Sequence, residues 1–420
     1  MRFWILNFGF WVVVAGAGAT VARAQDAWVL TTADFRNERV SLRAIGDNGL
    51  TIVGADAKAR NLPLDRLLQI ERVAAPRAAS GKFVLVLAGG DRLAGEPRGV
   101  EAETLAWAAP SLGEMKLPLK SVVLMYRPGK SEPALDRPRG TEDVVTLGNG
   151  DTVRGILNTI SDKSVAVQSA SGDVSEIPVE SIASIEFASA PGTGAGAGSN
   201  AATQRAGRAF RVALADGSAV TAPSVRKLDE NLVLALDDGS MRTLPFAAVA
   251  AIEQVNGPVL WLSSIVPNEN VQVPFLDYSA PARMNQSVTG RPIRFGDRTY
   301  SRGIGAHSYS RITWPIDPSV RAFRTQYAID GDMPYANVTV RIKLDDRVAY
   351  EKADVRAGAL SPVVLLDINR EKTITLEVDY GQTYDVQDRF NWIEPALLKV
   401  KPEAPVAPTT SPSTRPVLAQ

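Results

Sequence analysis

The feature that most constrains this chain is a pattern of 44 or 45 residues that occurs four times, at 28–72, 83–127, 144–187 and 210–254. Each copy contains short apolar runs separated by Gly, Asp and Asn, and each ends with a proline followed at a fixed distance by an apolar residue. The proline precedes that residue by seven positions in every copy: Pro63 and Ile70, Pro118 and Met125, Pro178 and Ile185, Pro245 and Ile252. A constant internal spacing of this kind predicts four copies of one structural unit.

The apolar runs within each copy are short and alternate with polar residues, which is typical of β-strands joined by tight turns. Units of this size with four or five bent strands resemble the Sm-like and SH3-like small barrels. We therefore expect four small β-barrel repeats. Their predicted bounds are 25–75, 80–128, 142–188 and 208–256.

Three segments have the composition of linkers or tails. A Pro- and charge-rich stretch at 129–141 separates the second and third copies, and a Gly/Ala/Ser stretch at 189–207 separates the third and fourth. Compositions of this kind are typical of flexible connections. The Pro/Thr/Ser-rich segment at 402–420 predicts a disordered tail.

The first 24 residues predict an export signal. Arg2 supplies a positive start, an uncharged apolar run covers 3–21, and Ala22-Arg23-Ala24 has the small-x-small pattern of a cleavage site. The alternative is an uncleaved anchor, since a run of this length could just span a bilayer. With cleavage, we expect no membrane insertion of the remaining chain and a periplasmic or extracellular location.

Composition excludes several classes of function. The 46 basic and 46 acidic residues balance, so the chain lacks the basic excess of a nucleic-acid-binding protein. It contains no cysteine, which excludes disulfides, thiolate metal sites and cysteine nucleophiles. An exported chain without disulfides must be stabilised by its hydrophobic cores.

The texture of the sequence changes at 258–401. Longer alternating strands appear, for example at 337–344 and 373–380, where every second residue is apolar. Together with 323–329 and 395–400, these runs predict an antiparallel β-sandwich. The fold class predicted for the whole chain is therefore all-β, with four barrel-like repeats followed by a jelly-roll sandwich.

Several motifs in this region, in order, resemble the NPCBM family of carbohydrate-binding modules, which are galactose-binding-like jelly rolls. They lie within 300–316, 323–333, 340–358 and 373–398. The residues that match the family pattern are Gly303, Gly305, His307, Asp330, Asp385, Asp388 and Trp392. The resemblance implies a β-sandwich that binds a glycan.

A sugar site needs an aromatic face against the C–H face of the pyranose ring, with planar hydrogen-bonding groups beside it. The residues of suitable type that we predict as carbohydrate contacts are His307, Trp314, Gln326, Tyr350, Asn391 and Trp392. Two of them have alternative interpretations. Trp392 lies beside the last strand and could belong to the core, and His307 could be a packed residue that holds a turn.

Four aspartates on predicted loops are candidate calcium ligands, because hard oxygen donors suit that ion. They are Asp330, Asp332, Asp385 and Asp388. Modules of the resembled kind often hold a calcium ion, so calcium is a possible cofactor by resemblance. The same acidic sequences are also typical of ordinary turns.

Catalysis is disfavoured by the residues that are missing. His307 is the only histidine, so neither a histidine metal cluster nor a triad supported by a nucleophile elbow can be assembled. Paired carboxylates for glycoside hydrolysis stay open, because acidic residues are plentiful and their spacing does not decide the question. The sequence therefore predicts an exported, non-enzymatic protein whose partner is a glycan or cell-envelope polysaccharide. Two alternatives remain: a scaffold that binds envelope proteins, and an accessory part of a glycoside hydrolase system.

Overall fold

The computed structural model describes residues 27–74, 81–128, 140–188 and 207–400, apart from 238, 276–278, 297 and 332. The predicted signal at 1–24, the predicted tail at 402–420 and most of the two predicted linkers lie outside these residues. The described part consists of β-strands and short 3₁₀ helices, so the all-β prediction is confirmed. None of its helices is long and apolar enough to cross a membrane.

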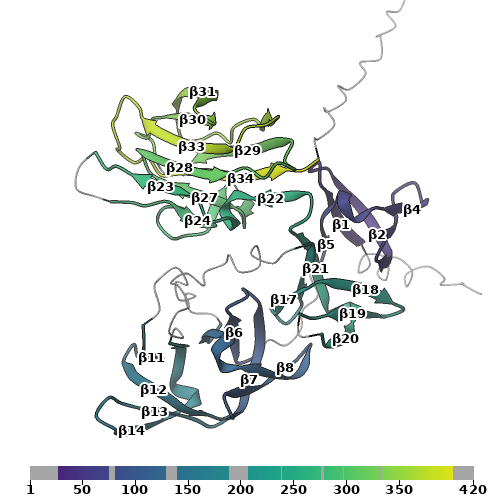
Figure 1. Cartoon of the computed structure of the whole chain (residues 1–420), viewed down its shortest axis with the longest axis vertical. Helices are drawn as coiled ribbons and strands as arrows, with labels where there is room; N and C mark the ends of the chain where they lie inside the picture. Colours follow the sequence, from purple (N-terminus) through teal and green to yellow (C-terminus); the bar gives the residue numbers. More distant parts are fainter. Residues whose placement is uncertain are drawn as a thin grey trace, which may run out of the picture.

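The N-terminal part contains four units of the same strand order, shown in purple to dark green in Figure 1. Unit 1 consists of β1 (Ala27–Thr32), β2 (Asn37–Gly46), β3 (Gly49–Val53), β4 (Ala59–Leu62), the 3₁₀ helix η1 (Leu64–Arg66) and β5 (Leu67–Arg72). All its pairings are antiparallel, in the order β5-β1-β2-β3-β4.

Units 2 to 4 follow the same scheme. Unit 2 contains β6 (Phe83–Leu87), β7 (Arg92–Glu101), β8 (Thr104–Ala109), β9 (Gly113–Pro118), η2 (Leu119–Ser121) and β10 (Val122–Tyr126). Unit 3 contains β11 (Asp143–Leu147), β12 (Thr152–Ile160), β13 (Ser164–Gln168), β14 (Val174–Pro178), η3 (Val179–Ser181) and β15 (Ile182–Glu186). In unit 4 the second strand is split: β16 (Ala209–Leu214), β17 (Ala219–Ala222), β18 (Ser224–Leu228), β19 (Asn231–Ala235), β20 (Met241–Pro245), η4 (Phe246–Ala248) and β21 (Val249–Val255).

The regularly spaced proline has a defined structural role. In each unit it is the N-cap of the single-turn 3₁₀ helix that leads into the last strand, with φ of −58° or −59°. Proline suits this position because its ring fixes φ near this value and the residue needs no backbone donor there. The invariant spacing therefore marks the turn between the fourth strand and the closing strand.

The expectation of small barrels is wrong in one respect. Each unit stays open, because its fourth strand and its closing strand do not pair with each other, and in unit 4 the strands β18, β19 and β20 form a separate sheet. The closing strand instead uses its free edge to pair with another unit. This outward pairing replaces the closure expected of an isolated barrel.

Units 1 and 4 pair through their closing strands, as do units 2 and 3. β5 runs antiparallel to β21 with Ile70 opposite Ile252, and β10 runs antiparallel to β15 with Met125 opposite Ile185. In both cases the residues that face each other occupy the same position of the repeat. Each pair of units is therefore related by a local two-fold axis through the closing strands.

An arginine at the end of the closing strand of unit 1, and one directly after that of unit 2, link each pair of units. Arg72 donates through Nε to the carbonyl oxygen of Val249, at 2.8 Å, and through a terminal nitrogen to that of Phe246, at 3.0 Å. Arg127 makes the equivalent bonds to Ile182 and Val179, both at 2.8 Å. Each guanidinium thus binds carbonyl oxygens at the 3₁₀ turn of the opposite unit and the strand after it.

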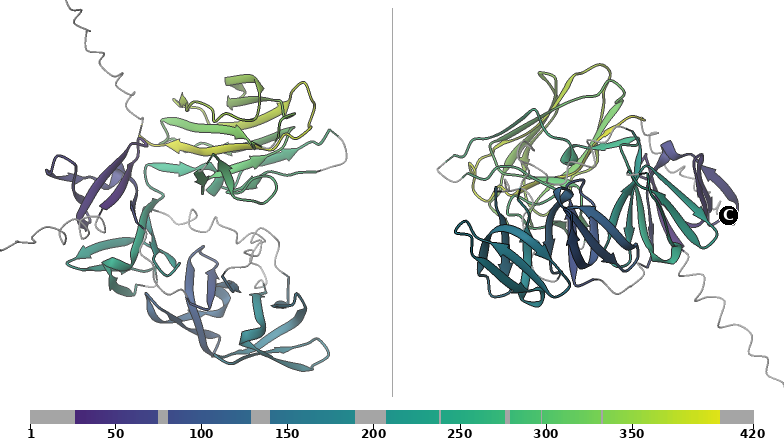
Figure 2. Two further views of the ribbon diagram at one scale, coloured as in Figure 1. Left: turned by 180° about the vertical axis from the view of Figure 1, so that it is seen from behind. Right: turned by 60° about the horizontal axis from the view of Figure 1, so that its bottom comes forward.

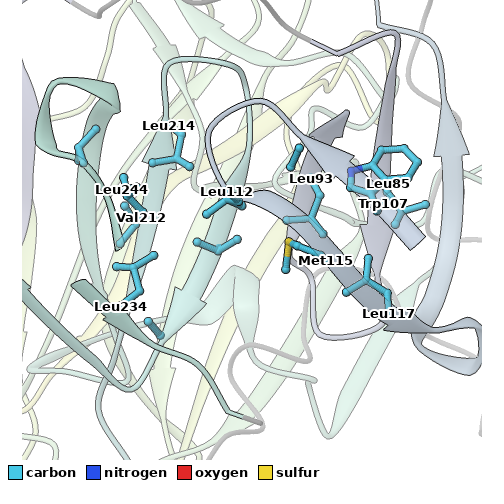
Figure 3. Packing of buried hydrophobic residues seen from close by; sticks show 14 of the residues in the cluster. Leu85, Leu93, Trp107, Leu112, Met115, Leu117, Val212, Leu214, Leu234 and Leu244 are labelled. Atoms are coloured by element: carbon cyan, nitrogen blue, oxygen red, sulfur yellow. The ribbon is translucent and has the colours of Figure 1, made fainter. Parts of the chain in front are cut away.

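One continuous hydrophobic core joins the four units. Figure 3 shows part of it: Trp107, Met115 and Leu117 of unit 2 lie on one side, and side chains of unit 4 such as Val212 lie on the other. Leu112 of unit 2 lies between the two groups. The four units therefore share a hydrophobic core and are not independent of one another.

The C-terminal part is a two-layer sandwich, visible from behind in the left view of Figure 2. One sheet contains β22 (Val259–Trp261), β24 (Arg283–Met284), β27 (Gly303–Ala306), β29 (Ala322–Ile329), β32 (Val364–Asp367) and β34 (Phe390–Leu398). The other contains β23 (Glu269–Gln272), β28 (Ser310–Pro315), β30 (Val338–Leu344), β31 (Arg347–Val355) and β33 (Thr373–Tyr380). The 3₁₀ helix η5 (Leu262–Ser264) and a hairpin of β25 (Ile293–Phe295) and β26 (Arg298–Tyr300) complete this part.

The alternation found in the sequence fills the space between the two sheets. Val338, Val340, Ile342 and Leu344 are all buried on one face of β30, and the intervening residues are half-buried. This pattern follows from the two-residue period of side chains in a strand. The sandwich prediction for this region is confirmed.

Candidate functional site

The two glycines of the G-x-G-x-H sequence are there for close packing. A Cβ atom at Gly305 would lie 2.3 Å from the backbone nitrogen of Val288, and one at Gly303 would lie 2.7 Å from the carbonyl oxygen of Trp392. Both distances are too short for any side chain. The glycines allow β27 to pack closely between β24 and β34, and the loop that carries His307 follows directly after this strand.

Two predicted sugar contacts, Trp314 and Trp392, belong to the core, so this prediction is wrong. Both are fully buried, and the indole nitrogen of Trp314 donates to the carbonyl oxygen of Ile265 at 3.0 Å. Trp392 packs edge-on against Phe390, with ring centroids 5.1 Å apart. Neither indole has a face open to a ligand, because alternation along β28 and β34 turns both into the sandwich.

The other predicted sugar contacts are distributed over the domain. Asn391 is buried and donates to Asp330 at 2.8 Å, so it is a structural residue and not a ligand contact. The hydroxyl of Tyr350 lies 2.7 Å from that of Tyr327. Gln326 is half-buried and donates to the carbonyl oxygen of Ser361 at 2.8 Å. The structure does not bring these side chains together into one site.

Three of the four predicted calcium ligands, Asp330, Asp385 and Asp388, accept hydrogen bonds from protein donors. Asp330 accepts from Asn391, and Asp385 accepts from the backbone nitrogen of Phe275 at 3.2 Å. Asp332 lies outside the described residues. Within the residues that the structure describes, no three Asp, Glu or His side chains are grouped so that they could hold a metal ion. The described aspartates therefore do not support the calcium site.

Asp388 ties three loops of the sandwich together at one end. It is completely buried and accepts from the hydroxyl of Ser308 at 2.5 Å and from the backbone nitrogen of Asn337 at 3.1 Å. Burial raises the pKa of this carboxyl to about 6, and the negative charge of Asp385 acts in the same direction. Its role is to join the loop after β27, the loop before β30 and the loop before β34.

Three exposed aromatic side chains lie in loops at this end of the sandwich. Phe275, Tyr335 and Tyr384 have 48%, 65% and 57% of their surface exposed, although each is a large side chain. The rings of Phe275 and Tyr384 stack at 4.5 Å between centroids and 29° between planes. We call these three residues the aromatic ledge. They come from three different loops that meet at one end of the sandwich.

The loops that carry the ledge are held by specific contacts. Tyr335 binds the loop of Tyr384 twice: its nitrogen donates to Gln387 at 3.1 Å, and its carbonyl oxygen accepts from Thr383 at 2.9 Å. Tyr384 has φ of +58°, a left-handed conformation that is uncommon for a bulky residue. Strained residues of this kind are often found at binding sites, where the surrounding contacts maintain them.

His307 lies in the same group of loops. It is half-buried, and its Nδ1 lies 3.2 Å from the carbonyl oxygen of Ser308, the residue that donates to Asp388. The loop continues into Tyr309, whose ring faces that of Tyr380 at 6.4 Å. His307 therefore lies in a turn beside the ledge, where its Nδ1 contacts a backbone carbonyl oxygen.

This fold and this loop end agree with one sequence family. Residues 259–398 match the family described as "NPCBM/NEW2 domain". This part of the chain is an NPCBM domain. The match covers the whole sandwich, including both sheets and the loops of the aromatic ledge, and ends before the described chain does.

The chain is also similar to a curated protein. The chain is 28% identical over 122 residues to a protein of Renibacterium salmoninarum named "Putative endo-alpha-N-acetylgalactosaminidase". The aligned part covers 29% of this chain and 8% of that protein. The chain thus spans a small fraction of the length of this relative.

Solved structures similar to the chain include two from Clostridium perfringens. One is a CBM51 module of ZmpB in complex with GlcNAc, with its INT domains. The two chains are 20% identical, the match covers 42% of this chain and 37% of that chain, and the TM-score is 0.31. The other is a CBM51 module of a GH95 protein in complex with methyl-galactose. Here the two chains are 19% identical, the match covers 33% of this chain and 99% of that chain, and the TM-score is 0.30.

The ledge residues were missed by reasoning from the sequence. Trp314 and Trp392 drew attention as tryptophans, whereas Phe275, Tyr335 and Tyr384 lie in loops with no periodic pattern. A usable signal was present: each lies outside the alternating strands, where an aromatic residue is not needed for a core. Aromatic residues in loops are the better candidates for a ligand contact.

Proposed function

We propose that this protein binds a glycan through the aromatic ledge of its NPCBM domain. The observation that carries the proposal is the exposure of three aromatic rings, two of them stacked, at a loop end of a domain from a carbohydrate-binding family. An exposed ring offers the flat apolar face that the C–H face of a pyranose requires.

Polar groups beside the ledge can supply the directional part of recognition. Asp385 lies next to Tyr384 and contacts the backbone of Phe275, and His307 lies in the neighbouring turn. Carboxylate and imidazole groups can accept or donate hydrogen bonds to sugar hydroxyls. We expect weak binding, in the micromolar to millimolar range that is typical of one open site.

We further propose that the chain is exported and does not itself catalyse a reaction. Export is supported by the sequence of residues 1–24, and the lack of catalysis by the match of residues 259–398 to a carbohydrate-binding family. The enzyme name of the Renibacterium relative belongs to a protein of which this chain matches 8%. With an N-acetylgalactosaminide as substrate, we expect no hydrolysis by the purified chain.

The proposal is tested by titrating the full chain with galactose, N-acetylglucosamine and N-acetylgalactosamine, followed by NMR or calorimetry. Replacing Tyr384 by Ala removes a ring of the ledge and should weaken binding about tenfold, close to 1.4 kcal/mol, whereas Phe at this position should retain most of it. Val363→Ala is the matched control, because Val363 is an equally exposed apolar residue outside the ledge.

Two results would count against the proposal. Equal affinities of the Tyr384→Ala variant and the control would remove the ledge from the site. Absence of binding to a broad glycan array, together with capture of an envelope protein that sugar does not compete for, would favour the scaffold alternative. Because the described aspartates are held by protein donors, a chelator should leave the affinity unchanged.

A further inference from the structure

A cavity lies between the NPCBM domain and the N-terminal units. It has a volume of about 330 Å³ and is lined by residues of unit 1, unit 4 and the NPCBM domain. A volume of this size is at the lower end of the range, about 300–1,000 Å³, that is usual for small-molecule sites. It shares no lining residue with the aromatic ledge.

Aromatic and cationic contacts hold the two sides of this cleft in place. Phe35 of unit 1 packs edge-on against Trp261 of the NPCBM domain, with centroids 5.9 Å apart. The guanidinium of Arg324 lies 4.0 Å from the centroid of the same Phe35 ring. Phe35 has φ of +63°, so the turn of unit 1 adopts an unfavourable conformation that places this ring against the domain.

The charges of the cleft are balanced within its own walls. Arg302 donates to both carboxylate oxygens of Glu253, at 2.9 and 3.1 Å, which links the NPCBM domain to unit 4. Glu394 contacts both Arg298 and Arg324, at 3.2 and 3.5 Å. The lining contains three arginines and three glutamates, so its formal charge is zero. A charged ligand would gain no net attraction here.

The lining also contains amides and hydroxyls. Beside the apolar and aromatic side chains of Val29, Phe35, Leu68 and Trp261, the uncharged polar ones are Thr31, Asn37, Gln69, Thr299, Tyr300, Ser301 and Gln326. Such groups donate and accept, and a guanidinium or carboxylate that is already paired still has free donor or acceptor positions. A neutral ligand that offers many donors and acceptors in a small volume matches this lining. Sugar hydroxyls have this property.

We infer that the cleft is a second sugar-binding site, for a neutral mono- or disaccharide, and that unit 1 supplies one of its walls. This inference rests on the proposed function only for the chemical class of the ligand, because the cleft and the ledge are built from different residues. It gives the N-terminal units a direct part in recognition, since the NPCBM domain alone presents one side of the site.

The test uses the full chain labelled with ¹⁵N at the tryptophan indoles, with galactose and N-acetylglucosamine as probes. Trp261 lines the cleft, and its resonance among the seven tryptophans is assigned with Trp261→Phe. We expect a saturable shift of this resonance in the wild type and in a Tyr335→Ala, Tyr384→Ala double variant. The shift should be lost in Ser301→Tyr, which fills the cleft from an exposed position.

Each other outcome identifies what has failed. A Trp261 resonance that does not move while the ledge binds sugar overturns the cleft and leaves the proposed function intact. A shift that disappears in the double ledge variant, or that survives Ser301→Tyr, also overturns it. No binding in either assay overturns both. As a second variant, Arg298→Ala should weaken the shift at least threefold in apparent affinity, because Arg298 is 63% exposed at the cleft.

Discussion

At the scale of single residues, the ionisation of Asp388 affects the stability of the fold. Its folded pKa of about 6 lies above the ordinary value of 3.8, so the folded state binds a proton more readily than the unfolded state. The free energy of unfolding should therefore fall as the pH rises from about 4 to about 6. The shift corresponds to a loss of at most about 3 kcal/mol from this one group.

The measurement is chemical unfolding of the wild type and of Asp388→Asn between pH 4 and 7. The amide is neutral throughout, so the difference between the two curves isolates the titration of Asp388. We expect the variant to gain stability relative to the wild type as the pH rises. A constant difference would show that Asp388 is not a high-pKa group.

Trp392 gives a second prediction at this scale. Because it is fully buried between the sheets, Trp392→Ala should lower the free energy of unfolding by about 3–5 kcal/mol. Tyr384→Ala removes a ring of similar size from the exposed ledge and should cost less than about 0.5 kcal/mol in thermal or chemical unfolding. Comparable losses for the two variants would contradict the assignment of one to the core and the other to the surface.

The residues show which parts of the site could be predicted from the sequence. The alternation of β30 and β33 was sufficient to predict the sandwich. Side chains in a strand point to opposite faces in turn, so the apolar residues identify the buried face of each strand. The ledge could not be predicted in this way. Phe275, Tyr335 and Tyr384 are distant in the sequence, and only the hydrogen bonds between loops bring them together.

At the scale of elements, the closing strands and their arginines hold the N-terminal units in pairs. Arg72→Ala removes two charge-assisted hydrogen bonds and the contact of the guanidinium with the Trp28 ring, 4.5 Å from its centroid. We expect a loss of about 2–3 kcal/mol in the unfolding of the N-terminal part. Arg127→Ala should have a similar effect, since the same bonds are made there.

The control for both variants is Arg43→Ala, an exposed arginine on β2 of unit 1, which should change stability by less than about 0.5 kcal/mol. Calorimetry of the full chain would give the three values. If Arg72→Ala lowered the free energy of unfolding as little as the control does, the arginine would not stabilise the pairing of the units.

Pairing between units also explains why the sequence predicted barrels and the structure contains open sheets. The repeat specifies five strands and the turn before the last one, and these elements are present in each unit. Whether the last strand returns to its own sheet or pairs with a neighbour depends on residues far away in the sequence. A pattern within one copy carries no information about that choice.

At the scale of the whole molecule, the NPCBM domain has a core of its own, separate from that of the N-terminal units. A fragment of residues 258–400 should therefore fold by itself and retain the ledge. It should also expose a small apolar face of Val259, Ala322, Ala396 and Leu398, which Ala33 and Leu68 of unit 1 cover in the full chain. Circular dichroism and sugar titration of the fragment test this.

The expected result is a folded fragment with a melting temperature below that of the same domain in the full chain, and with unchanged affinity at the ledge. An unfolded fragment would mean that the N-terminal units are required for the sandwich to form. An exposed apolar face favours self-association of the fragment. The variant Leu398→Ser lies on this face, so it should reduce self-association without helping the fragment to fold.

The order of pairing has a consequence for how the chain folds during synthesis. The pair of units 2 and 3 lies inside the pair of units 1 and 4 in the sequence. Units 2 and 3 are neighbours, whereas unit 1 can pair with unit 4 only after units 2 and 3 have been made. The inner pair can form once residue 186 has been made, but β5 stays without its partner strand until β21 follows. The newly made chain therefore carries an unpaired strand edge for about 180 residues. Such an edge is the natural target for a chaperone, and an early stop within unit 4 should produce a chain that aggregates.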